Sequence, residues 1–222
     1  MSLAIVIPAF NTQSTLERVL SEIPSSLKGQ VIIVDDGSSP PLSAEGVRLI
    51  RHPANRGYGA AQKTGYDAAL AMGAERVVLL HGDGQYATHD VLALNDVLAV
   101  CDAAIGSRFL NMAADQIPLW RRVGNRTLTM MANMRFGTSV SELHSGARGF
   151  RAETLRRLDY HRFSDDYIFD NEVLATLLSQ GASIGERKVK CAYDETVQSI
   201  ALGPSIRYAL GVVRTIVRPP SQ

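Results

Sequence analysis

Residues 31–38 read Val31-Ile32-Ile33-Val34-Asp35-Asp36-Gly37-Ser38, four apolar residues followed directly by two carboxylates and a turn. A short apolar run without alternation is typical of a strand buried on both faces of a parallel sheet. Residues 3–7 form an earlier run of the same kind, which Pro8 ends. The two runs therefore predict strands of one sheet with helices on both of its faces.

Strands and helices alternate along the rest of the chain. The apolar runs predict further strands at residues 47–50, 76–80, 103–105, 146–150 and 184–189, the last as an edge strand. Helical spacing predicts helices from the capping box of Ser14 and Glu17 to Pro24, over 57–72, 91–100, 119–136 and 170–180, and from Pro204 to about Val217. This order predicts an α/β fold with one Rossmann-like, mostly parallel sheet flanked by helices.

The composition is that of a globular protein. With 222 residues, 45% of them apolar, the chain can close a full core, and we expect a single domain over 1–222. The 23 Lys and Arg nearly balance the 22 Asp and Glu, which disfavours a nucleic-acid-binding protein. Cys101 and Cys191 suit a reducing compartment, and we find neither a signal peptide nor a membrane-spanning run. We expect a cytoplasmic protein that can touch a membrane from outside.

Polar residues follow the predicted strands at the points where these strands end. In open parallel sheets, ligands bind beyond the carboxyl ends of the strands. We therefore expect one edge of the sheet to collect Asn11, Asp36, Asn55, Arg56, Asp83, Gln85 and Arg108. A carboxylate such as Asp36 can accept hydrogen bonds from a ribose or a base, although a loop aspartate can equally cap the next segment.

Residues 81–85 read His81-Gly82-Asp83-Gly84-Gln85 and follow a predicted strand. On extended backbone, positions 81, 83 and 85 face one way and offer one nitrogen and two oxygen ligands. This set predicts a divalent-cation site, and the two glycines let a phosphate approach the backbone. The alternative is an ordinary glycine-rich turn.

Arginines and further polar residues complete the candidates. Residues 55–59 precede a helix and could cradle a phosphate, but they lack the G-x-G-x-x-G pattern of a Rossmann dehydrogenase. Arg108, Arg121 and Arg122 are candidate phosphate ligands. The candidates for a general base or a positioning residue are Glu142, His144, Ser145, Asp170 and Glu172.

The last predicted helix carries Arg207, Arg214 and Arg218 on one side. A basic amphipathic helix can lie on an anionic membrane surface. The alternative is a helix that packs on the core with one solvated face.

Seven motifs in this order resemble those of the family 2 glycosyltransferases, from about residue 3 to about residue 215. They are Ile7-Pro8-Ala9-Phe10-Asn11, Val34-Asp35-Asp36-Gly37-Ser38, Asn55-Arg56-Gly57-Tyr58-Gly59, Gly82-Asp83-Gly84-Gln85-Tyr86, Gly106-Ser107-Arg108-Phe109, His144-Ser145-Gly146 and Phe169-Asp170-Asn171-Glu172. The most similar branch is that of the dolichyl-phosphate mannosyltransferase-like polyprenyl-phosphate glycosyltransferases. The resemblance implies a GT-A fold, with a nucleotide-sugar-binding half at 1–110 and an acceptor-side half at 111–222 that ends in the amphipathic helix.

The resemblance also implies a chemistry. The protein would pass a hexose from a UDP- or GDP-sugar to a polyprenyl phosphate with inversion, using Mg²⁺ or Mn²⁺. Donor or acceptor would be bound by Pro8, Ala9, Phe10, Asn11, Asp36, Arg56, His144 and Ser145, and by Arg108 with one of Arg121 and Arg122. The metal ligands would be His81, Asp83 and Gln85, and Asp170 and Glu172 would position the sugar or the acceptor.

The sequence departs from the family pattern at three positions. The family commonly has Asp where His81 stands, Glu where Thr12 stands and Asp where Glu142 stands. An imidazole ligand favours Mn²⁺ over Mg²⁺ and could also mean weak metal binding. Two alternatives therefore stay open: transfer to a saccharide or protein hydroxyl, with Asp170 or Glu172 as base, and a catalytically impaired nucleotide-sugar-binding protein. Membrane contact would be peripheral, on the inner face of the cytoplasmic membrane.

Overall fold

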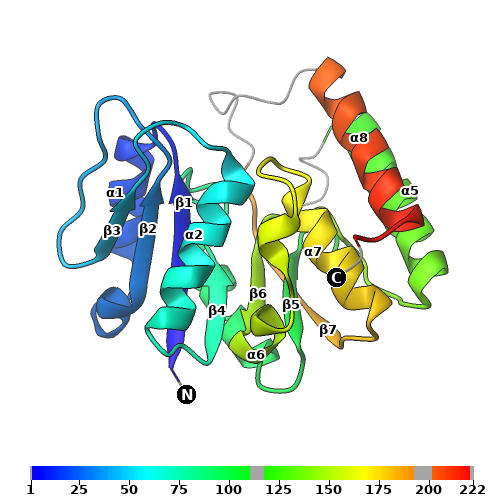
Figure 1. Cartoon of the computed structure of the whole chain (residues 1–222), viewed down its shortest axis with the longest axis horizontal. Helices are drawn as coiled ribbons and strands as arrows, with labels where there is room; N and C mark the ends of the chain where they lie inside the picture. The colour runs from blue at the N-terminus through cyan, green and yellow to red at the C-terminus, as the bar shows by residue number, and fades with distance from the viewer. Residues whose placement is uncertain (1, 111–117, 193–201, 221–222) are drawn as a thin grey trace.

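Among the residues that the structure describes, seven strands form one sheet at the centre of the molecule (Figure 1). The computed structural model describes residues 2–110, 118–192 and 202–220. The strands are β1 (Leu3–Ala9), β2 (Val31–Asp35), β3 (Arg48–Arg51), β4 (Arg76–Leu79), β5 (Ala103–Ser107), β6 (Arg148–Arg151) and β7 (Ile184–Lys188), in the order β3-β2-β1-β4-β6-β5-β7. β6 is antiparallel to β4 and β5, and the other pairs are parallel. The predicted α/β fold and the edge position of β7 are confirmed.

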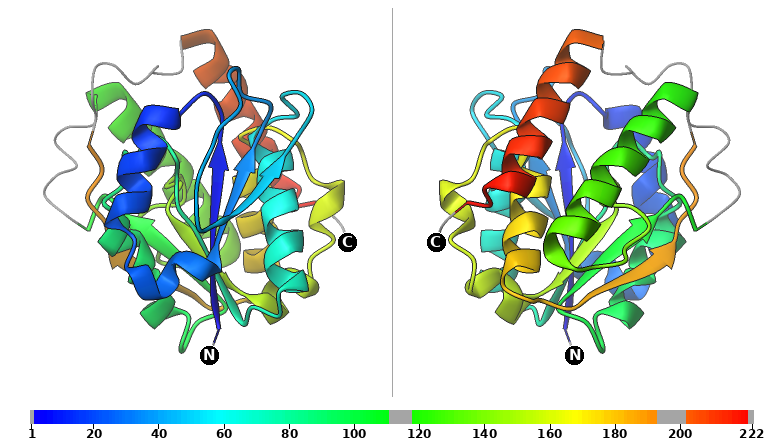
Figure 2. Two further views of the ribbon diagram at one scale, coloured as in Figure 1. Left: turned by 90° about the vertical axis from the view of Figure 1, so that its left-hand side faces the viewer. Right: turned by 90° about the vertical axis from the view of Figure 1, so that its right-hand side faces the viewer.

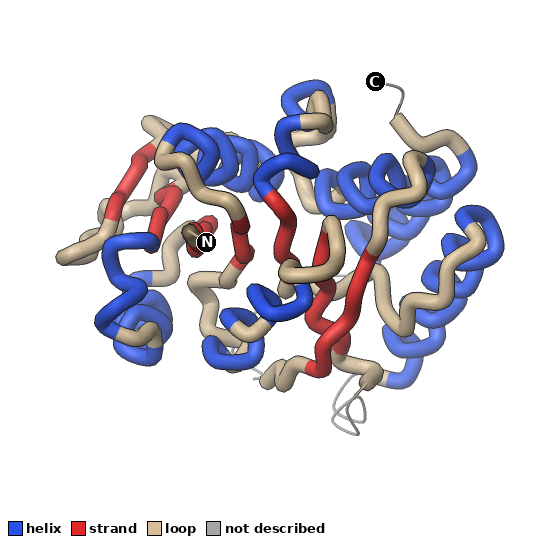
Figure 3. The backbone as a smooth tube through the Cα atoms, turned by 90° about the horizontal axis from the view of Figure 1, so that it is seen from below, coloured by secondary structure: helices blue, strands red, loops and turns tan. Residues whose placement is uncertain are grey.

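Helices cover both faces of the sheet (Figures 2 and 3). They are α1 (Gln13–Glu22), α2 (Tyr58–Ala71), α3 (Thr88–Leu92), α4 (Leu94–Val97), α5 (Leu119–Phe136), α6 (Ala152–Arg156), α7 (Phe169–Ser179) and α8 (Leu202–Val217), with short 3-10 helices at Ser25–Gln30 and Tyr160–Arg162. α8 lies beside α5 and α7 at the end of the molecule opposite β3 (Figure 1).

Two apolar cores explain why the strand sequences are apolar without alternation. Val6 and Val34 point to the core under α2 and α7, whereas Ile5 and Ile33 point to the core under α1, α3 and α4. Successive side chains of a strand face opposite sides, so a sheet covered on both faces needs apolar residues at every position. All residues of β1 and β2 are buried accordingly.

Three local expectations were wrong. α1 begins at Gln13 with Thr12 as its N-cap, so Ser14 lies inside the first turn and forms no capping box with Glu17. The helix expected over 91–100 is split into α3 and α4, because Ala93 ends one and precedes the other. The strand expected at 146–150 begins at Arg148.

The last helix packs on the core with one solvated side, whereas its contact with a membrane stays a prediction and the Arg207 side chain lies outside the described residues. Val212 and Ile216 are buried in the core, whereas Arg214 and Arg218 are exposed. Among the described helices, none has both the length and the hydropathy that crossing a membrane requires.

Candidate active site

The loops after β2 and β4 lie on either side of the carboxyl end of β1. The backbone N–H of Asp36 donates to the carbonyl of Ala9 at 2.9 Å. On the other side, a Cβ added at Gly82 would lie 3.3 Å from the Cβ of Ala9, and Thr15 Oγ1 donates to the Gly82 carbonyl at 2.8 Å. The predicted convergence at one edge of the sheet is therefore confirmed for these two loops. We call this edge, where the parallel strands end, the carboxyl edge.

The Asp36 carboxylate holds the loop that precedes α2. It accepts hydrogen bonds from the backbone N–H groups of Arg56 and Gly57, both at 2.9 Å, and its Oδ1 lies 2.6 Å from His52 Nδ1. Asp36 is only 4% exposed. The carboxylate thus brings residues 55–57 to the carboxyl edge, and its predicted contact with a ribose stays a prediction. His52 has no sequence signal that points to this role.

Phe10 and Asn11 lie just beyond β1. Asn11 adopts a φ of +53°, its N–H donates to Ser38 Oγ at 2.8 Å, and its Oδ1 accepts from the Ser39 N–H at 2.9 Å. These bonds tie the end of β1 to the turn after β2. The Phe10 ring is 45% exposed beside them, which leaves a flat apolar surface at this edge.

Residues 81–85 form a tight turn and not an extended segment. Gly84 has a φ of +67°, and Asp83 Oδ1 accepts a hydrogen bond from the Gln85 N–H at 3.0 Å. The His81 ring packs between the Tyr58 and Tyr86 rings, with centroids 5.6 and 5.5 Å away, and its Nε2 lies 2.9 Å from the Tyr58 hydroxyl. The expectation that the three side chains face one way on extended backbone is wrong.

This arrangement changes which residues fit a divalent cation. Within residues 2–110, 118–192 and 202–220, no group of three His, Cys, Asp or Glu side chains is placed to hold a metal ion. His81 is placed less well than the other two residues, because its Nε2 lies against the Tyr58 hydroxyl and its ring packs between Tyr58 and Tyr86. Asp83 and Gln85 fit as oxygen donors, the ligand type that Mg²⁺ and Mn²⁺ take. The predicted roles of His81, Asp83 and Gln85 as metal ligands stay predictions.

Asp170 sits in a buried hydrogen-bond network with α2. Its Oδ1 accepts from Gln62 Nε2 at 2.8 Å, and its Oδ2 accepts from the Tyr58 hydroxyl at 3.4 Å. Asp170 is 8% exposed. Burial, and secondly the charge of Asp170, raise the pKa of Tyr58 well above its ordinary value, so the phenol stays protonated and able to donate. The network links Asp170 to His81 through Tyr58.

Glu172, two positions after Asp170, has different hydrogen-bond partners. One of its oxygens accepts from the Ser164 N–H at 2.7 Å and the other from Ser164 Oγ at 3.0 Å. These bonds hold the loop before α7 against the helix. Both carboxylates thus accept hydrogen bonds from groups of the protein. The predicted catalytic roles of Asp170 and Glu172 stay predictions.

Arg108 is anchored by a fully buried carboxylate at the end of β5. The backbone N–H and Nε of Arg108 each donate to Glu142 at 2.8 Å, and Nη2 contacts the same carboxylate and the His144 carbonyl, the latter at 3.2 Å. Glu142 is 0% exposed. Arg121 and Arg122 lie in the first turn of α5, where the Arg121 guanidinium is 4.9 Å from the centre of the Trp120 ring.

Arg148 holds together the loop that carries His144 and Ser145, although it is not among the candidates predicted from the sequence. Its guanidinium donates to the carbonyls of Ser145 at 2.8 Å and Leu143 at 3.0 Å, and also to the carbonyl of Asp170. Arg148 is 1% exposed. An arginine inside a predicted strand of a buried sheet was the available signal, because a charge there requires partners.

Tyr86 fixes the same loop from the other side. Its hydroxyl accepts from the Gly146 N–H at 2.9 Å and lies 3.4 Å from Ser145 Oγ. Ser145 is fully buried. The structure therefore places Ser145 in the support of the carboxyl edge, and its predicted contact with substrate stays a prediction.

His144 is a neutral imidazole in a positive surrounding. Its Nδ1 lies 3.4 Å from the Tyr208 hydroxyl, and burial first, then the charges of Arg148 and Arg108, lower the pKa of His144 to about 3. The unfolded chain binds a proton near the ordinary pKa of about 6.5, so it gains protons over the folded state as the pH falls below that value. This contribution to stability is present above pH 6.5 and is lost progressively toward pH 3.

We expect a measurable pH effect from this histidine. Between pH 7 and pH 5, the free energy of unfolding should fall by about 2 kcal/mol through His144 alone. The check is urea unfolding at both pH values for the wild type and for His144→Gln, which cannot titrate. The loss between the two pH values should be smaller in His144→Gln by that amount, and equal losses would contradict the assignment.

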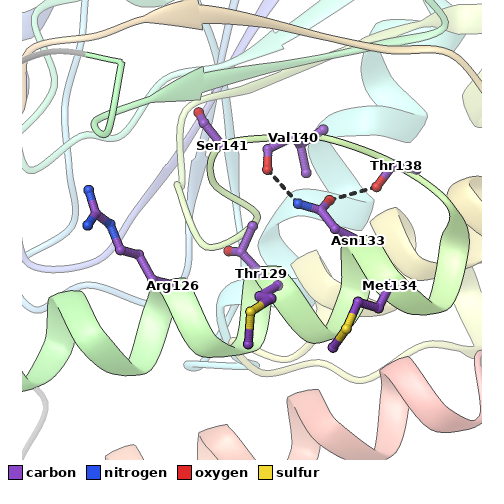
Figure 4. Close-up of a pocket in the computed structure, with 8 residues that line it drawn as sticks. Arg126, Thr129, Asn133, Met134, Thr138, Val140 and Ser141 are labelled. Atoms are coloured by element: carbon purple, nitrogen blue, oxygen red, sulfur yellow. Dashed lines mark hydrogen bonds between the residues drawn. The ribbon is translucent and has the colours of Figure 1, made fainter.

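A separate open pocket of about 400 Å³ lies between α5 and the loop at 138–141 (Figure 4). Arg126, Thr129, Asn133 and Ser141 are among its lining residues. Asn133 bridges its floor by hydrogen bonds to Thr138 and to the Val140 carbonyl. None of the candidate site residues predicted from the sequence lines it, so we do not assign it to the site.

Comparison with known proteins decides the family. The family model described as Glycosyl transferase family 2 matches residues 4–159, more than half of the chain. The chain belongs to glycosyl transferase family 2. The resemblance of its motifs to those of this family is thereby confirmed, and as a member of the family the protein is a glycosyltransferase.

Two relatives and one solved structure match most of the chain. An uncharacterised protein of Methanocaldococcus jannaschii, MJ1222, is 31% identical, covering 86% of this chain and 82% of its own. A UDP-N-acetylglucosamine–dolichyl-phosphate N-acetylglucosaminyltransferase of Methanococcus voltae is 28% identical, covering 91% and 89%. Glucosyl-3-phosphoglycerate synthase of Mycobacterium tuberculosis, solved with UDP, superposes with a TM-score of 0.69 at 18% identity, covering 100% of this chain and 82% of the synthase. The last likeness confirms the GT-A fold.

Proposed function

We propose that this glycosyltransferase passes a hexose from a UDP- or GDP-sugar to a polyprenyl phosphate with inversion at the anomeric carbon. The observation that carries the proposal is the placement of the Asp36 and 81–85 loops on either side of the carboxyl end of β1. One extended ligand with a nucleoside at one end and a diphosphate in its middle can contact both loops. The N-acetylglucosaminyltransferase relative, named for a dolichyl-phosphate acceptor, matches about nine tenths of the chain and supports the acceptor class.

The donor would lie across the end of β1. Pro8, Ala9, Phe10 and Asn11 form the floor, and the exposed Phe10 ring offers a surface against which a base can stack. The ribose would lie toward Asp36 and the loop at 55–57. The diphosphate would then reach the 82–85 turn, where the glycines leave the backbone open.

A divalent cation would be held by Asp83 and Gln85, with the diphosphate supplying further oxygen ligands. Glucosyl-3-phosphoglycerate synthase, the neighbour in fold, has been solved with Mn²⁺ and UDP together. When bound, such a cation stabilises the negative charge that develops on the leaving diphosphate. Asp83 fixes its own loop at the same time through the hydrogen bond to the Gln85 N–H.

The state of the two carboxylates on α7 supports this acceptor class. A hydroxyl acceptor needs a general base to take its proton, but Asp170 and Glu172 already accept hydrogen bonds from Tyr58, Gln62 and Ser164 at both oxygens. A phosphate monoester is already anionic and needs no such base. One of its oxygens bonds to the anomeric carbon while the bond from that carbon to the diphosphate oxygen breaks, and the nucleoside diphosphate leaves.

Arginines on the acceptor side balance the phosphate charge. Arg108 is held at the end of β5 by Glu142, and the first turn of α5 carries Arg121 and Arg122. Guanidinium groups bind phosphate oxygens in a bidentate manner. The catalytically impaired alternative, which rests on the replacement of an acidic metal ligand by His81, is not favoured, because the chain belongs to a family of glycosyltransferases.

A transfer assay tests the proposal. The protein is incubated with Mn²⁺ or Mg²⁺, one radiolabelled UDP- or GDP-sugar at a time, and a short-chain polyprenyl phosphate. A labelled lipid-linked monosaccharide with inverted anomeric configuration, with release of the nucleoside diphosphate, is the expected result. Labelled saccharide or protein with unlabelled lipid, across all donors, would contradict it.

A further inference from the structure

α5 exposes an apolar row on the side that faces away from the sheet. Leu119, Val123, Met130 and Met134 are 65%, 56%, 55% and 71% exposed, respectively. At 3.6 residues per turn these four positions fall on one side of the helix, which they follow over almost its whole length. A helix normally buries its apolar side, so this row indicates a surface that meets an apolar environment.

α8 extends this surface at the same end of the molecule. Its Leu210 and Val217 are 67% and 57% exposed, whereas its other side packs inward. The right-hand view of Figure 2 shows α8 and α5 together at the end opposite β3, and Figure 4 shows Met134 pointing from α5 toward the side where α8 lies. We call the six exposed apolar residues of the two helices, together with the exposed Arg214 of α8 and Arg218 directly after it, the α5–α8 face.

The charge of the chain is concentrated in these two segments. Residues 119–136 and 202–218 contain seven arginines and no acidic residue. The remainder of the chain therefore has 16 of the 23 Lys and Arg but all 22 Asp and Glu. The two segments that carry the exposed apolar rows thus also carry an excess of seven positive charges.

We propose that the α5–α8 face docks on a lipid bilayer with anionic headgroups. Apolar side chains on a helix with basic flanks bury themselves at the boundary of headgroups and acyl chains, and arginines stay at the level of the lipid phosphates. Attraction to an anionic leaflet adds to this for each arginine near the surface. A second copy of the chain is disfavoured as the occupant, because two such faces would bring like charges together.

The inference deepens the proposed function and rests on it, since a long-chain polyprenyl phosphate is held in a bilayer. α5 carries Arg121 and Arg122 in its first turn, and docking of this helix brings both toward the headgroup region. Docking through this face therefore adds to acceptor recognition, because it brings the protein to the bilayer surface in which the lipid phosphate already lies.

Vesicle co-sedimentation tests the docking. Wild-type protein is mixed with vesicles of phosphatidylcholine alone and with vesicles containing about a third phosphatidylglycerol, at low and at high salt. We expect at least tenfold stronger partitioning onto the anionic vesicles at low salt, reduced severalfold by high salt. Equal partitioning onto both vesicles, or no binding to either, would overturn the proposal.

Matched variants distinguish binding through the α5–α8 face from nonspecific adsorption to the vesicles. The triple variant Val123→Asn, Met130→Gln, Met134→Gln should partition at least tenfold less, and Arg214→Gln with Arg218→Gln should lose severalfold. The control triple Leu49→Gln, Met72→Gln, Val100→Gln changes three apolar residues that are 37%, 43% and 79% exposed elsewhere, and should bind as the wild type does. Thermal melting confirms that each variant is folded. A loss in the control equal to that in the test triple would contradict the assignment.

Two acceptors distinguish failure of the docking from failure of the proposed function. With a water-soluble short-chain acceptor, the Val123–Met130–Met134 variant should keep wild-type turnover, and with a long-chain acceptor in vesicles it should lose most of it. Transfer to both acceptors at wild-type rates overturns the docking alone, whereas no transfer by the wild type to either acceptor overturns the proposed function. A dimer in light scattering that the triple variant breaks, without vesicle binding, assigns the face to a second copy and also overturns the docking.

Discussion

The Asp83→Asn variant is expected to lose at least a hundredfold in kcat while its melting temperature stays close to that of the wild type. Asparagine keeps the oxygen that accepts from the Gln85 N–H, so the turn is preserved. It removes the negative charge that would hold a cation beside the donor diphosphate. Loss of one group that stabilises developing charge costs about 10² to 10³ in rate, and steady-state transfer assays with varied Mn²⁺ measure it.

His81→Asn is the matched comparison, two positions away in the same turn. Because His81 contacts Tyr58 and packs between two tyrosine rings, its replacement should change the Mn²⁺ concentration for half-maximal activity by less than threefold. Asp83→Asn should raise that concentration more than tenfold. The reverse order, with His81→Asn shifting the Mn²⁺ requirement and Asp83→Asn leaving it unchanged, would show that the imidazole is the ligand after all.

Arg148→Met is expected to destabilise the protein by about 3 to 5 kcal/mol, the typical cost of breaking a buried charged network. The variant leaves the carbonyls of Leu143, Ser145 and Asp170 without their donor in the interior. It also removes the positive charge 3.8 Å from the Asp170 carboxylate. Urea unfolding monitored by circular dichroism gives the change in the free energy of unfolding.

Arg157→Met is the control for this prediction. The Arg157 side chain is 60% exposed and pairs with Asp102 at 3.6 Å, a contact typical of surface ion pairs. Its loss should cost no more than about 1 kcal/mol. Equal destabilisation by both variants would mean that Arg148 contributes packing volume alone and does not hold the 143–145 loop to α7.

Much of the fold could be predicted because a strand that is buried on both faces has an apolar run without alternation in the sequence. Apolar runs such as those of β1 and β2 predict central parallel strands, and the polar residues after them indicate the carboxyl edge. β6 shows the limit of this reasoning, since a short run with a glycine predicts a strand but not its antiparallel direction, which long-range pairing decides.

The site could be predicted at the level of loops and not of side-chain directions. The sequence placed residues 81–85 at the carboxyl edge correctly, but the ring contact of His81 depends on Tyr58, which is distant in sequence. Arg148 was missed for the same reason, because its partners come from the 143–145 loop and from α7. Residue types thus gave the chemistry of the edge, whereas tertiary packing decides which groups face it.

A crystal structure with UDP or GDP and Mn²⁺, using the nucleotide that raises the melting temperature more, tests the central claim most directly. We predict one nucleotide lying across the end of β1, its nucleoside beside Phe10 and Asp36 and its diphosphate against the 82–85 turn with the cation on Asp83. A nucleotide bound elsewhere, or one that touches only one of these two loops, would contradict the account.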